Sequence, residues 1–422
     1  MTENAPVPPT GPAPPFHWHP VTRIAFRFCF VYFILYVVCG QMLRGFLHTW
    51  NWGAPNYGVR PPVSTAVTWV IRHVFHDDRT PAMFGGSGDK IYDWVLGLCL
   101  FGSAVLLTVA WTVVDRRRRH YTRLHRAFRV FLRFALGSTL VGYGATKAVP
   151  LQMPYPQLTR LLEPYGNFSP MGVLWYSIGA SRPYEIFTGC IELLSGILLF
   201  IPRTQLLGAS LALASTVEVF TLNMTYDVPV KLLSFHLVLM SVVLLVPDVR
   251  RVCQAVFYHR AKWFAATAQI VFGAYLVGLA LYGSAQQWKR PFGGGAPKPP
   301  LYGIWVIDRM TIDSVERAPL VTDYDRWRRV VIQNPTSVTF WRMDDTALTF
   351  QGTVDVDTRT ITLTRAGSTS VFALEQPSGD RLILDGSLDG RKLHMETTYF
   401  DRSRFLLVNR GFNWIQELPF NR

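Results

Sequence analysis

The chain has 422 residues, of which 49% are hydrophobic and 17% are charged, and its formal net charge is +14. Soluble globular chains carry about 25% charged residues, so this composition argues against a soluble protein and favours an integral membrane protein. The basic residues gather in two segments between apolar runs, as in cytoplasmic loops under the positive-inside rule, so the charge indicates membrane topology and lipid contact rather than nucleic-acid binding.

Residues 1–20 are rich in proline, which predicts a disordered tail. Within residues 21–285, seven apolar runs predict a mainly α-helical membrane domain. The predicted spans are Ile24–Leu43, Ile91–Val114, Val130–Ala148, Tyr184–Ile201, Leu206–Leu222, Val230–Val246 and Phe264–Tyr282. Arginine-rich loops follow the second and the sixth span, which predicts a cytoplasmic N-terminus. Because the number of spans is odd, the C-terminal region is expected on the outer side.

Two shorter segments predict helices that lie on the outer surface. Val63–Phe75 has apolar residues at helical spacing but is too short to cross a bilayer. Ser169–Ala180 begins with a serine that can cap a helix. Between them, the stretch GGSGDK, Gly85–Lys90, lacks the spacing of a phosphate-binding loop and predicts a flexible turn.

The pattern changes after the last apolar run. Residues 286–300 are rich in glycine and proline and predict a linker. In residues 301–422, about nine short alternating runs, the last of them RFLLVN, predict an antiparallel, lipocalin-like β-barrel on the periplasmic side. The run LYGIWVID resembles the G-x-W entry of the lipocalin-like group, with Gly303 and Trp305 matching. In that group the Trp packs under an arginine from the last strand, which implies Arg410 for this role.

Polar side chains inside the predicted spans point to a site. Ionisable groups at membrane depth usually face a protein interior or a wet cavity. Counting about 1.5 Å per helical residue places Glu192, Glu218 and His236 roughly 8–12 Å below the outer surface. We predict one polar layer, open to the outside, that contains Glu192, Glu218, His236, Lys147, Tyr143 and Gln41.

Two interpretations of this polar layer stay open. In the functional one, Glu192 and Glu218 exchange protons, while Lys147 and His236 stabilise an oxyanion or a phenolate. In the structural one, the charges form a buried network that only fixes helix packing. Asp227 and Lys231, four residues apart in the sequence, are expected to pair at the rim of the layer.

Metal and haem sites are not expected. His236 is the single histidine within the predicted spans, so a bis-histidine haem has no second ligand at that depth. The stretch HVFHDD, His73–Asp78, is interpreted as the end of a solvated helix rather than as a metal site.

Three stretches resemble the DoxX-like membrane proteins, over about residues 131–248. They are RFALGSTLVGYGATKAVPLQMP, YEIFTGCIELLSGILLFIPRTQLLGASL and NMTYDVPVKLLSFHLVLM. Five residues match the recurring features of that family, namely Lys147, Glu192, Asn223, Asp227 and Lys231. A more distant similarity is to the helical domain of the vitamin K-dependent carboxylases, in which a lysine and a polar helix entry face a lipophilic quinol.

The resemblance implies a DoxX-type protein of the bacterial cytoplasmic (inner) membrane that binds a quinone or a similar lipophile as part of a redox system. The residues expected to contact the ligand are Tyr143, Asn223, Tyr226, Asp227 and Lys231. Membrane lipids and other redox subunits are the expected partners, without haem, nucleotide, metal or nucleic acid. The alternative is a non-catalytic lipid- or partner-binding membrane protein whose periplasmic barrel holds the ligand.

Overall fold

The computed structural model describes residues 18–40, 42–43, 56–153, 155–156, 160, 163–249 and 297–421, together with isolated residues between 267 and 289. It consists of two compact units. One unit is helical and comprises Met1–Tyr258 with Arg410–Arg422, and the other, His259–Asn409, contains the barrel. The barrel is therefore inserted in the sequence of the helical unit, whereas the sequence had predicted a barrel domain that extends to residue 422. The predicted tail, Gln41, most of the predicted linker and most of the predicted seventh span lie outside the described residues.

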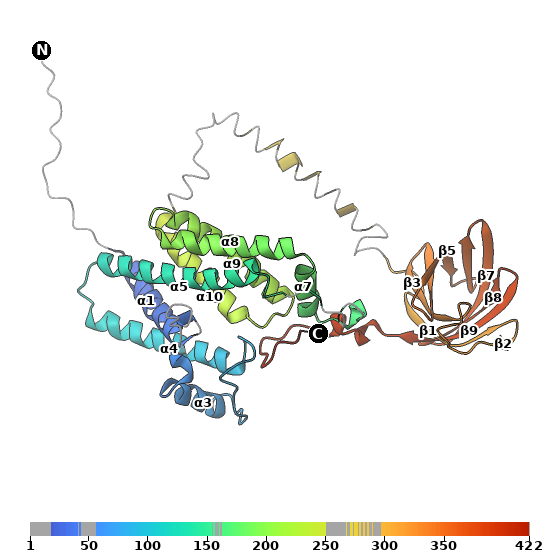
Figure 1. Ribbon diagram of the computed structural model, residues 1–422, viewed down its shortest axis with the longest axis horizontal. Helices are drawn as coiled ribbons and strands as arrows, with labels where there is room; N and C mark the ends of the chain where they lie inside the picture. Colours follow the sequence, from blue (N-terminus) through green and yellow to red (C-terminus); the bar gives the residue numbers. More distant parts are fainter. Residues whose placement is uncertain are drawn as a thin grey trace, which may run out of the picture. The chain divides into compact units, whose positions relative to one another are not determined.

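The helical unit is built from long helices and short turns (Figure 1). Its helices are α1 (Pro20–Cys39), α3 (Val63–His73), α4 (Ile91–Val114), α5 (Thr122–Ala148), α7 (Pro170–Gly179), α8 (Arg182–Phe200), α9 (Gln205–Thr225) and α10 (Lys231–Leu245). Its 3₁₀ turns are η1 (Tyr57–Val59), η2 (Tyr165–Asn167) and η3 (Val246–Asp248). The two short helices that the sequence predicted are present as α3 and α7, and the Ser169 hydroxyl caps α7 by accepting the Gly172 amide at 2.9 Å.

Five helices of the described chain, α1, α4, α8, α9 and α10, are long and apolar enough to cross a membrane. These helices are compatible with a membrane protein and match five of the seven predicted spans. The predicted span Val130–Ala148 forms the last 19 of the 27 residues of α5, and the eight residues before it are basic because they include Arg123, Arg126 and Arg129. α5 is therefore a continuous helix that is not among the five apolar candidates.

Glycines bring α5 and α8 into close contact. At Gly144, a Cβ atom would clash with the backbone of Leu193, and at Gly189 it would clash with the backbone of Ala148. Small residues at such positions let two helix backbones approach closely. This approach brings Lys147, at the end of α5, next to Glu192 on α8. In Figure 1, α5, α8, α9 and α10 lie side by side.

The barrel unit is a closed antiparallel barrel of eight strands, because β1 pairs with both β3 and β9. The two-residue strand β2 pairs with the end of β1. The strands are β1 (Gly303–Ile312), β2 (Val315–Glu316), β3 (Trp327–Asn334), β4 (Ser337–Arg342), β5 (Ala347–Asp355), β6 (Thr360–Arg365), β7 (Ser368–Ser378), β8 (Arg381–Leu388) and β9 (Arg391–Phe400). Large buried side chains form its core, among them Trp305, Phe340, Phe350, Phe372 and Met395.

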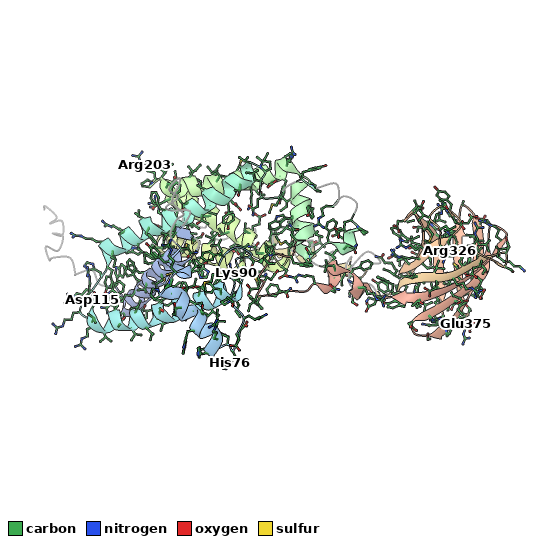
Figure 2. All side chains as sticks on the ribbon, turned by 60° about the horizontal axis from the view of Figure 1, so that its bottom comes forward. His76, Lys90, Asp115, Arg203, Arg326 and Glu375 are labelled. Carbon is green, nitrogen blue, oxygen red and sulfur yellow. The ribbon has the colours of Figure 1, made fainter. Side chains whose placement is uncertain are left out.

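Two predictions about the barrel are wrong. The run RFLLVN is not a strand, because it begins in the 3₁₀ turn η4 (Arg402–Arg404) and continues into α13 (Leu406–Asn409). Arg410 is not on the last strand, which ends at Phe400, but follows α13 and belongs to the helical unit. Arg326, labelled in Figure 2, is the arginine buried in the barrel, where it donates to the Ile307 carbonyl at 3.0 Å.

Candidate functional site

Three neighbouring cavities lie in the helical unit. The largest, the vestibule, has a volume of about 700 Å³ and is lined by residues of α1, α4, α5, α7 and α10 and of the loop Met83–Lys90. A lateral groove of about 280 Å³ lies along Ser138, Gly142 and Thr146 of α5. An inner pocket of about 60 Å³ lies between α5, α8, α9 and α10. Tyr143 and Leu233 line all three, so the cavities meet at these two side chains.

The inner pocket contains a buried ion pair. The Lys147 ammonium donates to Glu192 Oε1, and both residues are buried, with 7% and 5% exposure. Glu192 Oε2 and Gln152 Oε1 are buried acceptors without a hydrogen-bond partner among the described residues. On the opposite wall, Asn223 Nδ2 donates to Ser234 Oγ at 3.0 Å. Buried polar atoms are nearly always paired, so the two orphan oxygens mark a place that accepts a hydrogen-bond donor.

The predicted polar layer is only partly assembled around this pocket. Tyr143, Lys147, Glu192 and Asn223 line it together. Glu218, by contrast, is exposed on α9. Counting residues along the helix had predicted the depth of Glu218 below the outer surface, but not the face of α9 on which it lies. The buried side of α9 contains Ser215 and Thr216, and Glu218 lies two residues beyond Thr216, which is about 200° around a helix with 3.6 residues per turn. The proton-exchange role expected for Glu218 therefore has no support from its position.

His236 lies in a separate aromatic cluster. Its Nδ1 is 2.6 Å from the Leu232 carbonyl, which can only accept, so Nδ1 carries the proton. Its Nε2 then accepts from the Tyr32 hydroxyl at 2.7 Å, and its ring stacks on Tyr36 at 3.7 Å. Both ring nitrogens are thus engaged by protein groups, and the imidazole does not face Glu192. Tyr226 is half-buried and packs against the apolar cluster around α7.

The predicted pair of Asp227 and Lys231 is present within a larger buried charge cluster. Lys231 Nζ lies 3.1 Å from Asp227 Oδ1 and 3.7 Å from Asp89 Oδ2. Arg410 Nη2 lies 3.2 Å from Asp227 Oδ2. Phe412 adds a ring face 5.0 Å from the Lys231 ammonium. Two carboxylates and two cations therefore balance one another at the start of α10.

Asp89 caps α10 from a distant part of the sequence. Its carboxylate accepts the amides of Lys231 and Leu232 at 2.9 and 3.0 Å. The first amides of a helix have no partner within the helix, and Val230, the residue before α10, provides no side-chain cap. Burial raises the pKa of Asp89 above its ordinary value, and these two amides and the Lys231 ammonium offset only part of that rise.

The segment Arg410–Asn421 docks on this part of the helical unit (Figure 1). Asn413 donates from its amide and its side chain to the Asp227 carboxylate at 2.8 and 3.0 Å. The Gln416 amide donates to the Asp89 carbonyl at 2.9 Å, and Glu417 accepts the Ile91 amide at 3.2 Å. The docked segment contacts the loop Met83–Lys90, which forms a wall of the vestibule. Lys90 of this loop is labelled in Figure 2.

Gly86 shows how close this approach is. Its φ is +68°, and a Cβ atom there would clash with the Glu417 carbonyl. Ser87 adds hydrogen bonds from its amide to the Glu417 carbonyl and from its hydroxyl to the Gln416 carbonyl. The stretch that the sequence had predicted to be a flexible turn is therefore the docking loop of the segment Arg410–Asn421.

Comparison with known proteins gives one relative. The chain is 34% identical over 124 residues to the uncharacterized protein YwoB of Bacillus subtilis (strain 168), and the match spans 29% of this chain and 76% of YwoB. The chain belongs to the YwoB family. No family model matches the chain, and no solved structure matches it. Since YwoB is described only as uncharacterized, membership of the YwoB family supplies no activity, and the chemistry of the cavities must carry the functional argument.

Three residues of the site in this member of the YwoB family were not predicted from the sequence. No role in the site was predicted for Asp89 or Gln152, and Arg410 was predicted to lie in the barrel, over Trp305. Asp89 had only a misleading local signal, because an acidic residue next to the apolar run of α4 suggests a cap for α4, whereas Asp89 caps α10. Gln152 had only its place in LQMP, directly after α5. For Arg410, no local pattern reveals a partner that lies 183 residues earlier in the chain.

Proposed function

We propose that this protein binds a lipophilic molecule with a polar head group, with quinones as the favoured class, where the three cavities meet. The observation that carries the proposal is that Tyr143 and Leu233 line all three cavities. Ligand pockets are mostly apolar concave sites of about 300–1,000 Å³ with a few polar groups. The vestibule has about 700 Å³ and combines Leu96 and Leu100 with Tyr36 and Asp93.

The lateral groove supports a lipophilic ligand rather than a water-soluble one. It lies on a face of α5 where Gly142 and Thr146 are exposed. A Cβ atom on Gly142 would meet nothing within 4 Å, so this face has room for an apolar chain. The ligand's tail would lie in the groove and its head in the vestibule, next to the inner pocket with Lys147 and Glu192.

The wider setting is also part of the proposal. The resemblance to DoxX-like proteins supports a role in a quinone-linked redox system of a bacterial inner membrane, with the barrel on the periplasmic side. In this setting Lys147 and Glu192 would interact with the head group. The alternative, with the ligand inside the barrel, has less support, because large buried side chains such as Trp305 and Phe340 fill the described barrel core.

Filling the lateral groove tests the proposal. Gly142→Leu adds a side chain where a Cβ atom meets no neighbour, and glycine lowers helix stability by roughly 1 kcal/mol relative to good helix formers. The variant should therefore fold at least as well as the natural chain. Gly102→Leu on α4 is the matched control, because a Cβ atom there also meets nothing within 4 Å and Gly102 lines none of the three cavities.

The measurement is a titration of the full chain in lipid nanodiscs with a short-chain benzoquinone, followed by quenching of tryptophan fluorescence. Trp175 lines the vestibule and provides a nearby reporter. We expect saturable quenching in the natural chain and in Gly102→Leu, and weakened binding in Gly142→Leu. Equal binding by both leucine variants would contradict the proposed position of the ligand, and the absence of saturable quenching would contradict quinone binding.

A further inference from the structure

We infer that the inner pocket selects ligands whose head group donates a hydrogen bond, such as a phenol or the reduced, dihydroxy form of a quinone, over ligands that only accept, such as the oxidised form. This inference rests on the proposed function, because it concerns the head group of the same lipophile. It follows from two buried oxygens without a donor, Glu192 Oε2 and Gln152 Oε1, which belong to residues that line the inner pocket.

Glu192 provides the stronger of these two acceptors. Its Oε1 accepts from the Lys147 ammonium, and a carboxylate in such an ion pair has acceptor sites only. Its Oε2 has no donor among the described residues, although Glu192 is only 5% exposed. A hydrogen bond to a charged acceptor is stronger than one between neutral groups, so a hydroxyl placed here gains more than it would from a neutral partner.

Three further polar side chains that line the inner pocket, Asn223, Ser234 and Thr216, are engaged by the protein. Asn223 donates to Ser234 Oγ and to the Val230 carbonyl. The Ser234 hydroxyl donates to backbone carbonyls of its own helix, and so does that of Thr216. Their donor hydrogens are therefore not free to bind a carbonyl head group. Among the buried lining atoms that the structure describes, those left without any partner are the two acceptors, Glu192 Oε2 and Gln152 Oε1.

The size of the inner pocket sets how a head group can enter. A cavity of roughly 10–15 Å³ holds one water molecule, so the pocket of about 60 Å³ admits a hydroxyl and the ring atoms that carry it. Tyr143, Gln152, Val230 and Leu233 line both this pocket and the vestibule. The body of an aromatic ring would therefore remain in the vestibule while its hydroxyl enters the pocket. Water could occupy the inner pocket instead of the hydroxyl, and in that case ligands that donate and ligands that only accept would bind equally well.

A matched pair of probes separates a donor from a non-donor. 4-Pentylphenol donates a hydrogen bond, whereas 4-pentylanisole has the same ring and chain but cannot donate. Both are titrated into the full chain in nanodiscs, and their affinities are referred to their concentrations in the lipid phase. Leaving a buried acceptor unpaired weakens binding by roughly 10- to 100-fold, so we expect the natural chain to prefer the phenol by about this factor.

Variants assign the preference to the two oxygens. Lys147→Met with Glu192→Leu replaces the buried ion pair by apolar groups of similar volume, a change that is often neutral for stability, and it should abolish the preference. Gln152→Leu removes an orphan acceptor without changing charge and should reduce it. Glu218→Gln, a change of an exposed carboxylate outside the three cavities, should leave it unchanged.

The outcomes separate this inference from the proposed function. If both probes bind the natural chain equally well, water fills the inner pocket and the donor preference is overturned, while lipophile binding stands. If neither the probes nor the short-chain benzoquinone binds, the proposed function fails with it. A preference that survives in the Lys147→Met and Glu192→Leu double variant would overturn the assignment to Glu192.

Discussion

The buried charge cluster at the start of α10 gives a prediction with a definite magnitude. In the natural chain, Asp89 and Asp227 balance Lys231 and Arg410. Asp227→Asn leaves two cations facing one carboxylate. Asn tolerates the left-handed backbone that Asp227 adopts, with φ of 53°, so the variant changes the charge without adding backbone strain.

The expected loss follows from burial. Removing one partner of a buried ion pair destabilises a protein by about 3–5 kcal/mol. The side chains of Lys231 and Asp227 are 1% and 4% exposed, but that of Arg410 is 21% exposed, so water screens part of the excess charge. We therefore expect the lower end, about 3 kcal/mol. Adding Arg410→Met restores one cation per carboxylate and should recover about 1–2 kcal/mol, as coupled neighbours do in a double-mutant cycle.

The assay is reversible unfolding of the full chain in detergent by titration with SDS. Tryptophan fluorescence follows the unfolding, and Trp94 and Trp414, which pack edge to face with ring centroids 5.6 Å apart, are among the 13 tryptophans that contribute to it. Glu218→Gln is the control and should stay within about 0.5 kcal/mol of the natural chain. If Asp227→Asn is as stable as this control, or if the Arg410→Met change only adds a further loss, the cluster is not a coupled unit.

Three further predictions concern the barrel and the topology. A fragment of residues 297–409 should fold alone, and Trp305→Ala should destabilise it by about 3–5 kcal/mol in urea unfolding, because Trp305 is 2% exposed in the core; a change near zero would remove its core role. Burial lowers the pKa of His394, but Asp385 and Glu396 outweigh this effect and raise the pKa above its ordinary value. The contribution of protonated His394 to stability is therefore present below about pH 6.5 and is lost as the pH rises through the raised pKa. The same fragment has no other histidine, so the change of its stability across this window should shrink in His394→Gln. Alkaline phosphatase fused after Ala285 should be active if the barrel is periplasmic, whereas an inactive enzyme together with a fluorescent cytoplasmic fusion would reverse the proposed topology.

Element positions were largely predictable, because they depend on local patterns. The span Ile91–Val114 is apolar apart from Asp93 in its first turn and a few small polar residues, it lies between Lys90 and Asp115, and α4 has these same bounds. Strands of the barrel followed from alternation, since most of the buried strand residues are apolar. The prediction of a strand at RFLLVN was wrong because its apolar residues are consecutive and fit a helical turn as well as a strand.

The site was less predictable, because depth and partner are not local properties. Residue counting placed Glu192 and Glu218 at similar depth, yet only Glu192 faces the protein interior. The pair of Lys147 and Glu192 depends on the close glycine contact between α5 and α8. Arg410 and Asp89 meet at Asp227 and Lys231 through contacts between segments far apart in the chain, and a single sequence does not reveal such pairs.

Photo-crosslinking tests the central claim most directly. A short-chain quinone analogue that carries a diazirine on its tail is irradiated with the full chain in nanodiscs, and the labelled peptides are identified by mass spectrometry. If the ligand lies where the three cavities meet, the label will be found on peptides that contain Tyr143 and Leu233, and excess benzoquinone will displace it. Displaceable label on the barrel strands, or on exposed faces away from Tyr143, would contradict this account.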